Sequence, residues 1–239
     1  MDISNKKIIG FDLDGTLTQH KTLLDETNRN VLEKLAQKYH LVMFGAGSCE
    51  RIYKQMGNFP IEIIGQYGMQ HSIIEDGEFK LIEDITVECD KEKVTQIIES
   101  LRKRFNLPCL YGESVEFHSS GAVTFPILGT TAPGDEKVAY DPDRKKRRAI
   151  YKEVCQAFEG YNVFIGGSSS FDITSGPYNK FHAIKRYCQE HNLTIDNVIY
   201  VGDDFGEGGN DSPVINGGVD CVEVTDYRKL NEFLAFLLK

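Results

Sequence analysis

The sequence lacks the long apolar stretches that mark membrane and secreted proteins. Its 239 residues include no run near the ~20 apolar residues that a membrane-spanning helix needs. The opening residues, MDISNKKIIGFDLDG, pass from polar residues into a short apolar strand without the hydrophobic core of a signal peptide. Internal repeats and low-complexity tracts are also absent from the sequence. We therefore expect a cytoplasmic globular protein with no membrane partner.

The cysteines are scattered along the chain, and positive charge is in deficit. The six cysteines are scattered, with no C-x-x-C pair and no zinc-finger spacing, so we expect reduced thiols. Lysine and arginine number 27 against 36 aspartates and glutamates, which gives a formal net charge of −9. A surface of this sign repels nucleic-acid backbones and anionic lipid. We therefore expect no nucleic-acid partner, and an anionic substrate would need local positive charge or a metal ion.

Common nucleotide- and calcium-binding motifs are incomplete. The stretch G-A-G-S-C-E, which begins at Gly45, lacks the third glycine of a dinucleotide fingerprint, and the sequence has no G-K-[ST] of a P-loop. An EF-hand at residues 12–23 would require glutamate at its last position, where the chain has Leu23. These absences exclude three familiar ways of binding a nucleotide or calcium.

Apolar segments alternate between strand and helix spacing in the first third of the chain and again near its end. Short apolar runs such as residues 7–11 and 41–44 suit buried parallel strands, and residues 31–36 carry apolar side chains at helical spacing. This alternation predicts a parallel sheet with helices on its faces. The expected strands are residues 7–11, 41–44, 61–64, 198–201 and 221–224, and the expected helices are residues 25–39, 50–56, 180–191 and 227–238.

The middle of the chain follows a different pattern. Hairpin-like pieces flank Asp76-Gly77, and later strands are interleaved with two helices, which predicts a separate α+β module. We therefore predict the α/β fold class, with a Rossmann-like parallel-sheet core at residues 1–82 and 177–239 and an inserted α+β cap at residues 83–176. In this middle part we expect strands at 72–74, 79–82, 115–118, 122–125, 163–165 and 170–174, helices at 91–105 and 144–158, and a Gly/Pro-rich loop at 129–137.

Polar clusters follow the predicted core strands, where open α/β sheets place their sites. The first cluster pairs Asp12 with Asp14, and two such carboxylates can divide the roles of nucleophile or metal ligand and of acid. Ser48 follows a glycine-rich turn and could bind a phosphate oxygen, while Lys180 could offset phosphate charge. The last cluster is the acidic loop from residue 202 to residue 211, which suits a hard cation held by oxygen ligands.

Each cluster taken alone has a simpler interpretation. D-x-D-G is often only a turn, Ser48 alone would more often be a helix N-cap, and Lys180 alone would be a solvated lysine. The acidic loop alone could lie on the surface. All these clusters occur in order at strand ends or at a nearby helix start, which turns alone do not explain. Together they predict a phosphoryl-transfer site.

These clusters resemble the haloacid dehalogenase superfamily of phosphohydrolases, in which D-x-D-G-T is followed by a serine, a lysine and an acidic loop. The insertion between Ser48 and Lys180 resembles that superfamily's large cap. Within the superfamily, the chain is most similar to the eukaryotic-type phosphomannomutases, and the similarity spans nearly its whole length. The matching stretches are FDLDGTLT, GS followed after a helix by QMGN, VEF, IGG-x-x-SFD, and GD followed by GGND.

The resemblance implies a role for each core cluster. Asp12 would be the nucleophile that forms an aspartyl-phosphate, and Asp14 would be the general acid and base. Mg²⁺ would bind Asp12, the backbone carbonyl of Asp14 and Asp203, with Asp211 and Asp204 nearby. We count Asp211 among the candidate metal residues and leave open whether Asp211 or Asp204 ligates the ion directly. The transferring phosphate would be held by Ser48, Lys180 and Asn210. Such cations are needed because a carboxylate and a phosphate dianion repel each other.

The resemblance also assigns substrate contacts in the cap, where the chain departs from the mutases. Ser170 and Asp172 match positions that contact the sugar phosphate. At positions where the mutases carry arginines for the far phosphate, we align His118, Thr130 and Lys137, which cannot form the bidentate fork of arginine. The basic run at residues 145–148 lies close by, and we expect it to be a solvated helix face.

These departures favour a Mg²⁺-dependent phosphatase that acts on a small phosphorylated substrate, a hexose-phosphate-like sugar phosphate, through phospho-Asp12. The alternative is a phosphomannomutase, which returns the phosphoryl group to a second sugar hydroxyl and must grip a bisphosphate at both ends. A second alternative is a non-catalytic relative that binds phosphosugars. The resemblance further implies a homodimer formed through the cap, and we expect the cap to close by hinging near residues 80–84 and 175–178.

Overall fold

The computed structural model describes residues 2–238, and its contacts divide the chain into two compact units. The sequence placed the domain boundaries after residues 82 and 176, whereas the contacts change unit slightly later, after Asp84 and after Tyr178. A short segment from the acidic loop, Glu207–Asn210, groups with the middle of the chain. We call Met1–Asp84, Asn179–Gly206 and Asp211–Lys239 the core unit, and Ile85–Tyr178 with Glu207–Asn210 the cap unit.

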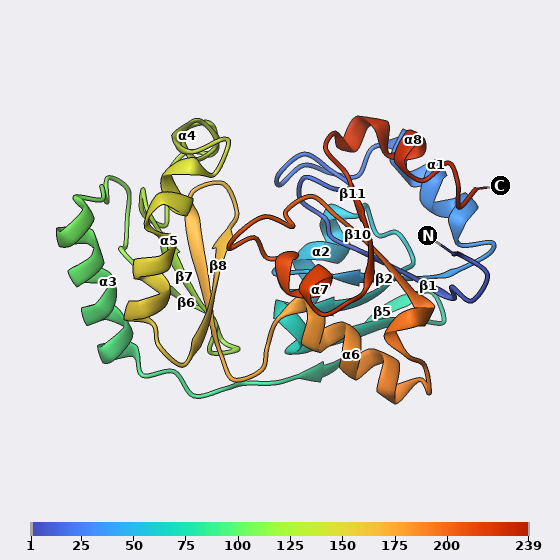
Figure 1. The fold of residues 1–239 in the computed structure, drawn as a ribbon, viewed down its shortest axis with the longest axis horizontal. Coiled ribbons are helices and arrows are strands. Elements are labelled where there is room, and N and C mark those ends of the chain that lie inside the picture. Colours follow the sequence, from blue (N-terminus) through green and yellow to red (C-terminus); the bar gives the residue numbers. More distant parts are fainter. Residues whose placement is uncertain (1, 239) are drawn as a thin grey trace. The chain divides into compact units, whose positions relative to one another are not determined.

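The core unit is built on a sheet of strand order β11-β10-β1-β2-β3-β4-β5 (Figure 1). Neighbouring strands from β11 to β3 run parallel, and the β4–β5 hairpin extends the sheet with antiparallel strands. The strands are β1 (Ile8–Phe11), β2 (His40–Phe44), β3 (Glu62–Gly65), β4 (Gln70–Glu75), β5 (Glu78–Asp84), β10 (Val198–Gly202) and β11 (Asp220–Glu223).

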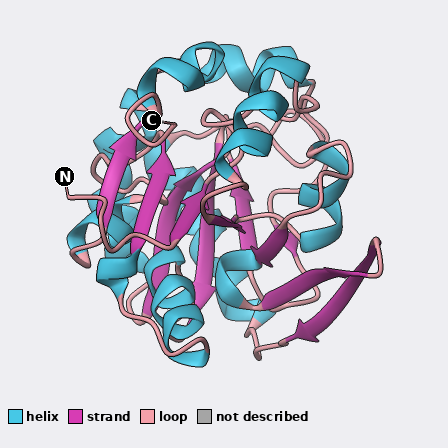
Figure 2. Cartoon of the chain, turned by 90° about the vertical axis from the view of Figure 1, so that its right-hand side faces the viewer, coloured by secondary structure: helices cyan, strands magenta, loops and turns pink. Residues whose placement is uncertain are grey.

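Both faces of the parallel part of this sheet are buried beneath helices (Figure 2). In β1, Ile9 and Phe11 join the apolar cluster of α1, α2 and α8, while Ile8 joins the cluster of α6 and α7. Burial on both faces explains why these strands read as continuous apolar runs. The helices are α1 (Glu26–Leu35), α2 (Cys49–Gln55), α6 (Lys180–Glu190), α7 (Ser212–Asn216) and α8 (Leu230–Phe233), with 3₁₀ turns η1 (Gln66–Gly68), η2 (Ile195–Asn197) and η3 (Tyr227–Lys229).

The cap unit contains an antiparallel sheet of order β6-β7-β9-β8. Phe125 and Phe171 pack with side chains of α3 and α5 on one face of this sheet. Thr124 and Asp172 alternate with these phenylalanines and are only partly buried on the other face. The elements are β6 (Glu116–Phe117), β7 (Val123–Pro126), β8 (Tyr161–Gly166), β9 (Ser170–Ser175), α3 (Lys91–Phe105), α4 (Gly134–Tyr140) and α5 (Lys145–Ala157).

The parallel-rich core sheet confirms the predicted α/β class, but some elements differ from expectation. The predicted loop at residues 129–137 runs into α4, a helix that buries none of its side chains and therefore leaves no apolar periodicity to detect. The helix expected at residues 227–238 is instead η3, the short α8 and tighter turns. Leu230, Leu234 and Leu237 keep helical spacing and are buried, yet Leu237 N–H donates to the carbonyl of Leu234 in a 3₁₀-type bond. Within residues 2–238, no helix has the length and apolar character needed to cross a membrane.

Candidate active site

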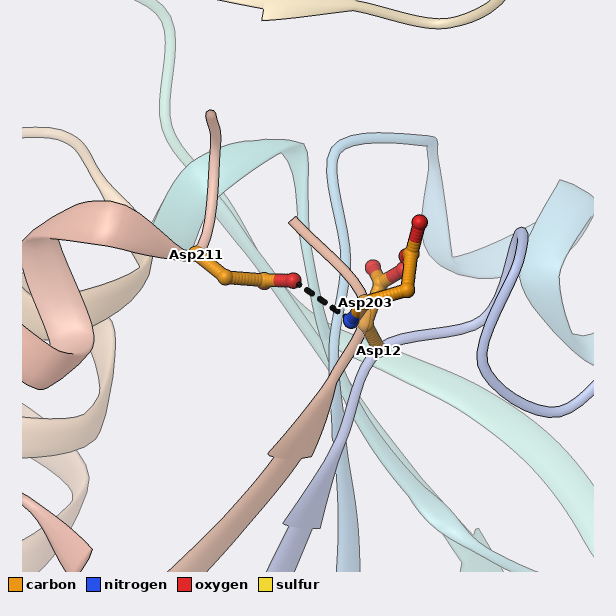
Figure 3. Close-up of side chains that lie close together, drawn as sticks. All are labelled: Asp12, Asp203 and Asp211. Carbon is orange, nitrogen blue, oxygen red and sulfur yellow. Dashed lines mark hydrogen bonds between the residues drawn. The ribbon is translucent and has the colours of Figure 1, made fainter. Parts of the chain in front are cut away.

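Three acidic side chains meet where β1 and β10 end (Figure 3). Asp12 follows the last residue of β1, and Asp203 follows the last residue of β10. Because these strands are parallel neighbours, the two carboxylates are delivered to the same edge of the sheet. Asp211 completes the group, and one carboxylate oxygen from each residue lies within 4.8 Å of the others. The sequence predicted this meeting.

Lys180 connects two of these carboxylates from the start of α6. Its Nζ donates to Asp12 Oδ1 at 2.6 Å and to Asp211 Oδ1 at 2.7 Å, and the lysine is fully buried. The simpler interpretation of a solvated helix lysine is therefore wrong. Burial lowers the pKa of Lys180, but the Asp12 and Asp211 charges outweigh it and leave the pKa above its usual value. The ammonium thus stays charged beside the predicted nucleophile.

Asp211 anchors the acidic loop from inside the protein. Its Oδ2 accepts hydrogen bonds from the backbone N–H groups of Asp203 and Asp204, both at 3.1 Å, and its Oδ1 accepts from the hydroxyl of Tyr200 at 2.6 Å. Burial raises the pKa of Asp211, but Lys180 and these donors outweigh burial and hold the pKa below its usual value. The ionised Asp211 therefore fixes the backbone that carries Asp203.

The donor set fits a hard divalent cation. Asp12, Asp203 and Asp211 bring three carboxylates to one place against a single buried ammonium, that of Lys180. Burial raises the pKa of Asp12 to about 7, and the charges of Asp211 and Asp203 add to the rise while Lys180 opposes it. Oxygen ligands of this kind suit Mg²⁺, and a bound cation would favour the ionised form of Asp12. The roles of Asp12, the Asp14 carbonyl, Asp203 and Asp211 as metal ligands remain predictions.

Asp14 turns its side chain to α2. Its Oδ1 accepts from the backbone N–H of Lys21 at 2.8 Å and from Gln55 Nε2 at 2.7 Å, and its Oδ2 lies 3.4 Å from Arg51 Nη1. Burial raises the pKa of Asp14, but Arg51 and the hydrogen bonds outweigh burial and lower the pKa. Lys21, Arg51 and Gln55 were missed as site residues. Gln55 belongs to the QMGN match, and Arg51 and Gln55 share a helical face.

The D-L-D-G loop passes close to the acidic loop because residue 15 is glycine. Gly15 has a φ of +99°, and a Cβ at this position would lie 2.6 Å from Asp203 Oδ2. The next residue, Thr16, donates from its hydroxyl to Asp203 Oδ1 at 3.3 Å. Gly15 therefore leaves room for Asp203 near the end of β1, and Thr16 holds Asp203 there with a hydrogen bond.

Ser48 is the last residue of the loop between β2 and α2, and it caps α2. Its hydroxyl accepts from the backbone N–H of Arg51 at 3.3 Å, which confirms the N-cap interpretation. Because β2 is the parallel neighbour of β1, the loop that carries Ser48 emerges at the same edge of the sheet as Asp12. The role of Ser48 in holding phosphate stays a prediction, as does that of Asn210, which belongs to the cap unit.

In the cap unit the predicted substrate residues fall into separate groups. His118 Nε2 lies 2.9 Å from the hydroxyl of Thr124, which donates to Asp172 Oδ1 at 3.4 Å. The hydroxyl of Ser170 instead donates to the carbonyl of Gly166 across the β8–β9 turn at 3.0 Å. On α4, Lys137 Nζ donates to the carbonyl of Thr130 at 3.2 Å. Thr124 was not predicted, and its place between His118 and Asp172 is visible only once β6, β7 and β9 are paired.

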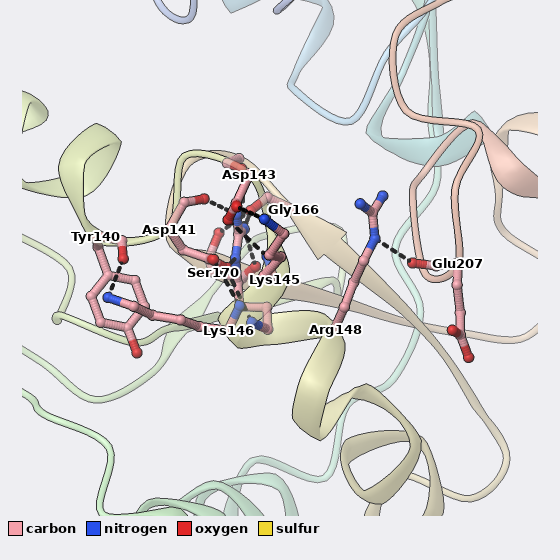
Figure 4. A network of polar contacts seen from close by, with 11 residues as sticks. Tyr140, Asp141, Asp143, Lys145, Lys146, Arg148, Gly166, Ser170 and Glu207 are labelled. Atoms are coloured by element: carbon pink, nitrogen blue, oxygen red, sulfur yellow. Dashed lines mark hydrogen bonds and ion pairs between the residues drawn. The ribbon is translucent and has the colours of Figure 1, made fainter.

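The basic run at the start of α5 is not a uniform solvated face (Figure 4). Lys145, Lys146 and Arg148 are exposed or half-buried as expected, but Arg147 is only 1% exposed. Its Nε forms an ion pair with Asp141 at 2.8 Å, and its Nη1 donates to the carbonyls at the β8–β9 turn. The expectation was wrong for Arg147 because a helix of this length presents one side to the sheet beneath it.

The chain is similar in sequence to proteins named phosphomannomutase. The model of the eukaryotic phosphomannomutase family matches residues 28–221. A phosphomannomutase from Encephalitozoon cuniculi is 26% identical over 96% of this chain and 94% of its own length, so that similarity includes the D-x-D-G-T segment. Phosphomannomutase 1 from Dictyostelium discoideum is 24% identical over 90% of this chain and 89% of its own length.

Solved structures support the fold. The IMP-nucleotidase of Plasmodium falciparum matches with a TM-score of 0.72 at 14% identity, over 99% of this chain and 69% of that one. A haloacid dehalogenase-like hydrolase from B. subtilis matches with a TM-score of 0.64 at 16% identity, over 95% of this chain and 92% of that one. Because the family model spans most of the chain, the resemblance to the mutases is confirmed: the chain belongs to the eukaryotic phosphomannomutase family.

Proposed function

We propose that the chain is a Mg²⁺-dependent hexose phosphate mutase that interconverts mannose 6-phosphate and mannose 1-phosphate through phospho-Asp12. Membership of the family makes it a phosphoryl-transfer enzyme. The sequence favoured a phosphatase, but the relatives named phosphomannomutase support the mutase alternative better. The observation that carries the proposal is the buried Lys180, which joins Asp12 to Asp211 beside Asp203 at the end of β1.

The chemistry would begin with attack of the Asp12 carboxylate on the phosphorus of the substrate. Lys180, already 2.6 Å from Asp12 Oδ1, would offset the negative charge that gathers as two anions approach. Ser48 and Asn210 would bind oxygens of the transferring phosphoryl group. A Mg²⁺ ion held by Asp12, Asp203, Asp211 and the carbonyl of Asp14 would supply further positive charge at this point.

Asp14 would serve both halves of the reaction. It would protonate the sugar oxygen that leaves as the bond to phosphorus breaks and Asp12 becomes phosphorylated. It would then take a proton from the acceptor hydroxyl, which attacks phospho-Asp12 and releases the Asp12 carboxylate. In a mutase that hydroxyl belongs to the sugar, and in a phosphatase it belongs to water.

A sugar-phosphate phosphatase is the second candidate, favoured by the cap residues. His118, Thr130 and Lys137 stand where we align arginines of the mutases, and Lys137 donates to the backbone of Thr130. A bisphosphate intermediate must be held at both ends while it turns, and this set offers no guanidinium fork for the far phosphate.

We retain as further proposals the closure of the cap at residues 80–84 and 175–178, a homodimer through the cap and a cytoplasmic location.

The deciding experiment offers mannose 1-phosphate with a trace of glucose 1,6-bisphosphate and Mg²⁺. We expect mannose 6-phosphate to form faster than inorganic phosphate, with the Asp12→Asn protein as the matched blank. Release of phosphate without isomerisation would replace the mutase with the phosphatase. A wild-type protein that is silent here and with aryl phosphates, acetyl phosphate and other sugar phosphates would support the non-catalytic relative instead.

A further inference from the structure

One face of α2 lies against Asp14. Arg51 and Gln55 are one helical turn apart, so their side chains project to the same side of the helix. Arg51 Nη1 donates to Gln55 Oε1 at 2.7 Å, and Gln55 Nε2 donates to Asp14 Oδ1 at 2.7 Å. Gln55 is only 8% exposed, so this chain of contacts is shielded from water at its centre.

The direction of the Gln55 amide is fixed by its partners. Its oxygen accepts from Arg51, which has no acceptor to offer, so that end of the amide must be the carbonyl. Its nitrogen therefore faces Asp14, and it also donates to the hydroxyl of Thr18 at 3.0 Å. Both ends of the Gln55 side chain are engaged, and the amide can only present N–H to Asp14.

The two oxygens of Asp14 consequently have different roles. Oδ1 accepts from two N–H groups, those of Gln55 and the backbone of Lys21, and has little capacity for another partner. Within residues 2–238, the hydrogen bond to Oδ2 is the long 3.4 Å approach of Arg51 Nη1, well beyond the usual length of a charge-assisted bond. Oδ2 is therefore the oxygen that can exchange a proton with the substrate.

Arg51 also belongs to the loop of the predicted phosphate ligand. Its backbone N–H donates to the Ser48 hydroxyl at 3.3 Å, and its guanidinium covers Gly47, where a Cβ would lie 2.2 Å from Nη2. The side chain is 41% exposed, so it can move without unfolding the helix. The same turn of α2 thus contacts Ser48 at one end and Asp14 at the other.

We propose that Arg51 and Gln55 are positioning residues for Asp14, which hold its carboxylate with Oδ1 bound to protein and Oδ2 turned to the substrate. The inference rests on the proposed role of Asp14 as general acid and base. Its consequence is selective: the pair matters where a sugar oxygen must be protonated as it leaves. It matters little where the leaving group departs as a stable anion, as nitrophenolate does.

The test is the rate of Asp12 phosphorylation in rapid-quench single turnovers with two substrates, mannose 1-phosphate and p-nitrophenyl phosphate. For Gln55→Leu we expect a loss of about tenfold or more with the sugar phosphate, part of the ~10²–10⁴-fold that general acid–base catalysis contributes. With p-nitrophenyl phosphate we expect the rate to stay within about twofold of wild type. Arg51→Met should show the same selectivity more weakly, and Arg51→Lys should recover most of the lost rate. Lys54→Met, which removes an exposed lysine of the same helix, is the matched control.

Equal losses with both substrates, or no loss with either, would overturn the positioning role. Arg51→Met removes a half-exposed side chain, so it tests the idea even if Gln55→Leu fails to fold. Failure of the proposed function itself looks different, because Asp14→Asn would then show no selectivity between the two substrates. If Asp14→Asn is selective and the α2 variants are not, the role of Asp14 stands and that of Arg51 and Gln55 falls.

Discussion

In the core unit the predicted catalytic side chains hold one another, whereas in the cap unit the predicted substrate residues are held by their own turns and strands. Lys180 joins Asp12 to Asp211, and Asp211 in turn binds the backbone of Asp203. In the cap, Ser170 bonds across its own turn and Lys137 bonds the nearby Thr130. The contrast is one of arrangement: the predicted catalytic residues form one interlocked group, while the predicted substrate residues belong to several small and separate groups.

Among variants of the core group, Asp12→Asn should have the strongest consequence. An amide is not a nucleophile towards phosphorus, so we expect turnover to disappear while the fold persists. The measurement is phosphoryl transfer to the protein from sugar and aryl phosphates, together with the circular dichroism spectrum. Beryllium fluoride should bind wild type and not the variant. Appreciable turnover by a folded Asp12→Asn protein would remove the nucleophile from Asp12.

The next largest loss of activity is expected when the divalent cation is removed by a chelator. Asp12, Asp203 and Asp211 crowd negative charge around Lys180, so we expect EDTA to abolish activity and Mg²⁺ to restore it. Asp203→Asn should raise the Mg²⁺ concentration needed for half-maximal activity. An exposed carboxylate variant such as Glu78→Gln is the control. Full activity in EDTA would contradict the role of these carboxylates.

The difference between the core unit and the cap unit also explains which parts of the site could be predicted from the sequence. Asp12 and Asp203 follow strand ends and Lys180 opens a helix, so their meeting follows from the order of a parallel sheet. The burial of Lys180 could not be foreseen, because helix spacing does not reveal which lysine faces a carboxylate. Gln55 stood in a matching motif but without a role, since its partner Asp14 lies on another element.

The cap was less predictable for a physical reason. Antiparallel strands alternate their side chains between faces, so the neighbours of Thr124 depend on strand register. Arg147 was assigned to a solvated run because its neighbours are charged, yet its guanidinium finds several backbone carbonyls and Asp141 within the unit. Charge composition alone does not distinguish a buried, fully bonded arginine from an exposed one.

For stability, the cap should depend most on Arg147. Arg147→Met removes the guanidinium from the buried carboxylate of Asp141, which keeps backbone donors, and from the carbonyls of the β8–β9 turn. Removing one partner of a buried pair typically costs about 3–5 kcal/mol, so we expect a loss of that size in the free energy of unfolding. Denaturant unfolding measures it, with the exposed Lys145→Met as the control. A loss equal to that of the control would show that the pair does not support the cap.

A carboxylate of the core offers the matching stability test. Glu62 accepts from His40 Nε2 at 2.7 Å, His71 Nε2 at 2.6 Å and the hydroxyl of Tyr187 at 2.8 Å. Burial raises the pKa of Glu62, but these hydrogen bonds outweigh burial and hold the pKa well below its ordinary 4.5. A lowered carboxyl pKa contributes stability that is fully present above the ordinary value and is lost as the pH falls towards the lowered one.

Glu62→Gln should therefore lower the free energy of unfolding by about 2 kcal/mol at pH 7, the scale of hydrogen bonds to a charged group. The difference from wild type should shrink as the pH falls below the ordinary carboxyl pKa. Urea unfolding at several pH values measures this, with Glu78→Gln as the exposed control. A difference that does not change with pH would mean that the charge of Glu62 contributes nothing.

In the cap, replacing Thr124 should change substrate binding only modestly. Thr124→Val keeps the side-chain shape but removes the hydroxyl between His118 and Asp172. We expect the KM for mannose 1-phosphate to rise roughly fivefold, equivalent to about 1 kcal/mol for one neutral hydrogen bond, with kcat nearly unchanged. Thr95→Val on α3 removes a hydroxyl that bonds only within its own helix and is the control. If the two variants have the same KM, the group formed by His118, Thr124 and Asp172 does not bind substrate. Specificity must then be sought in Lys137 and Thr130 instead.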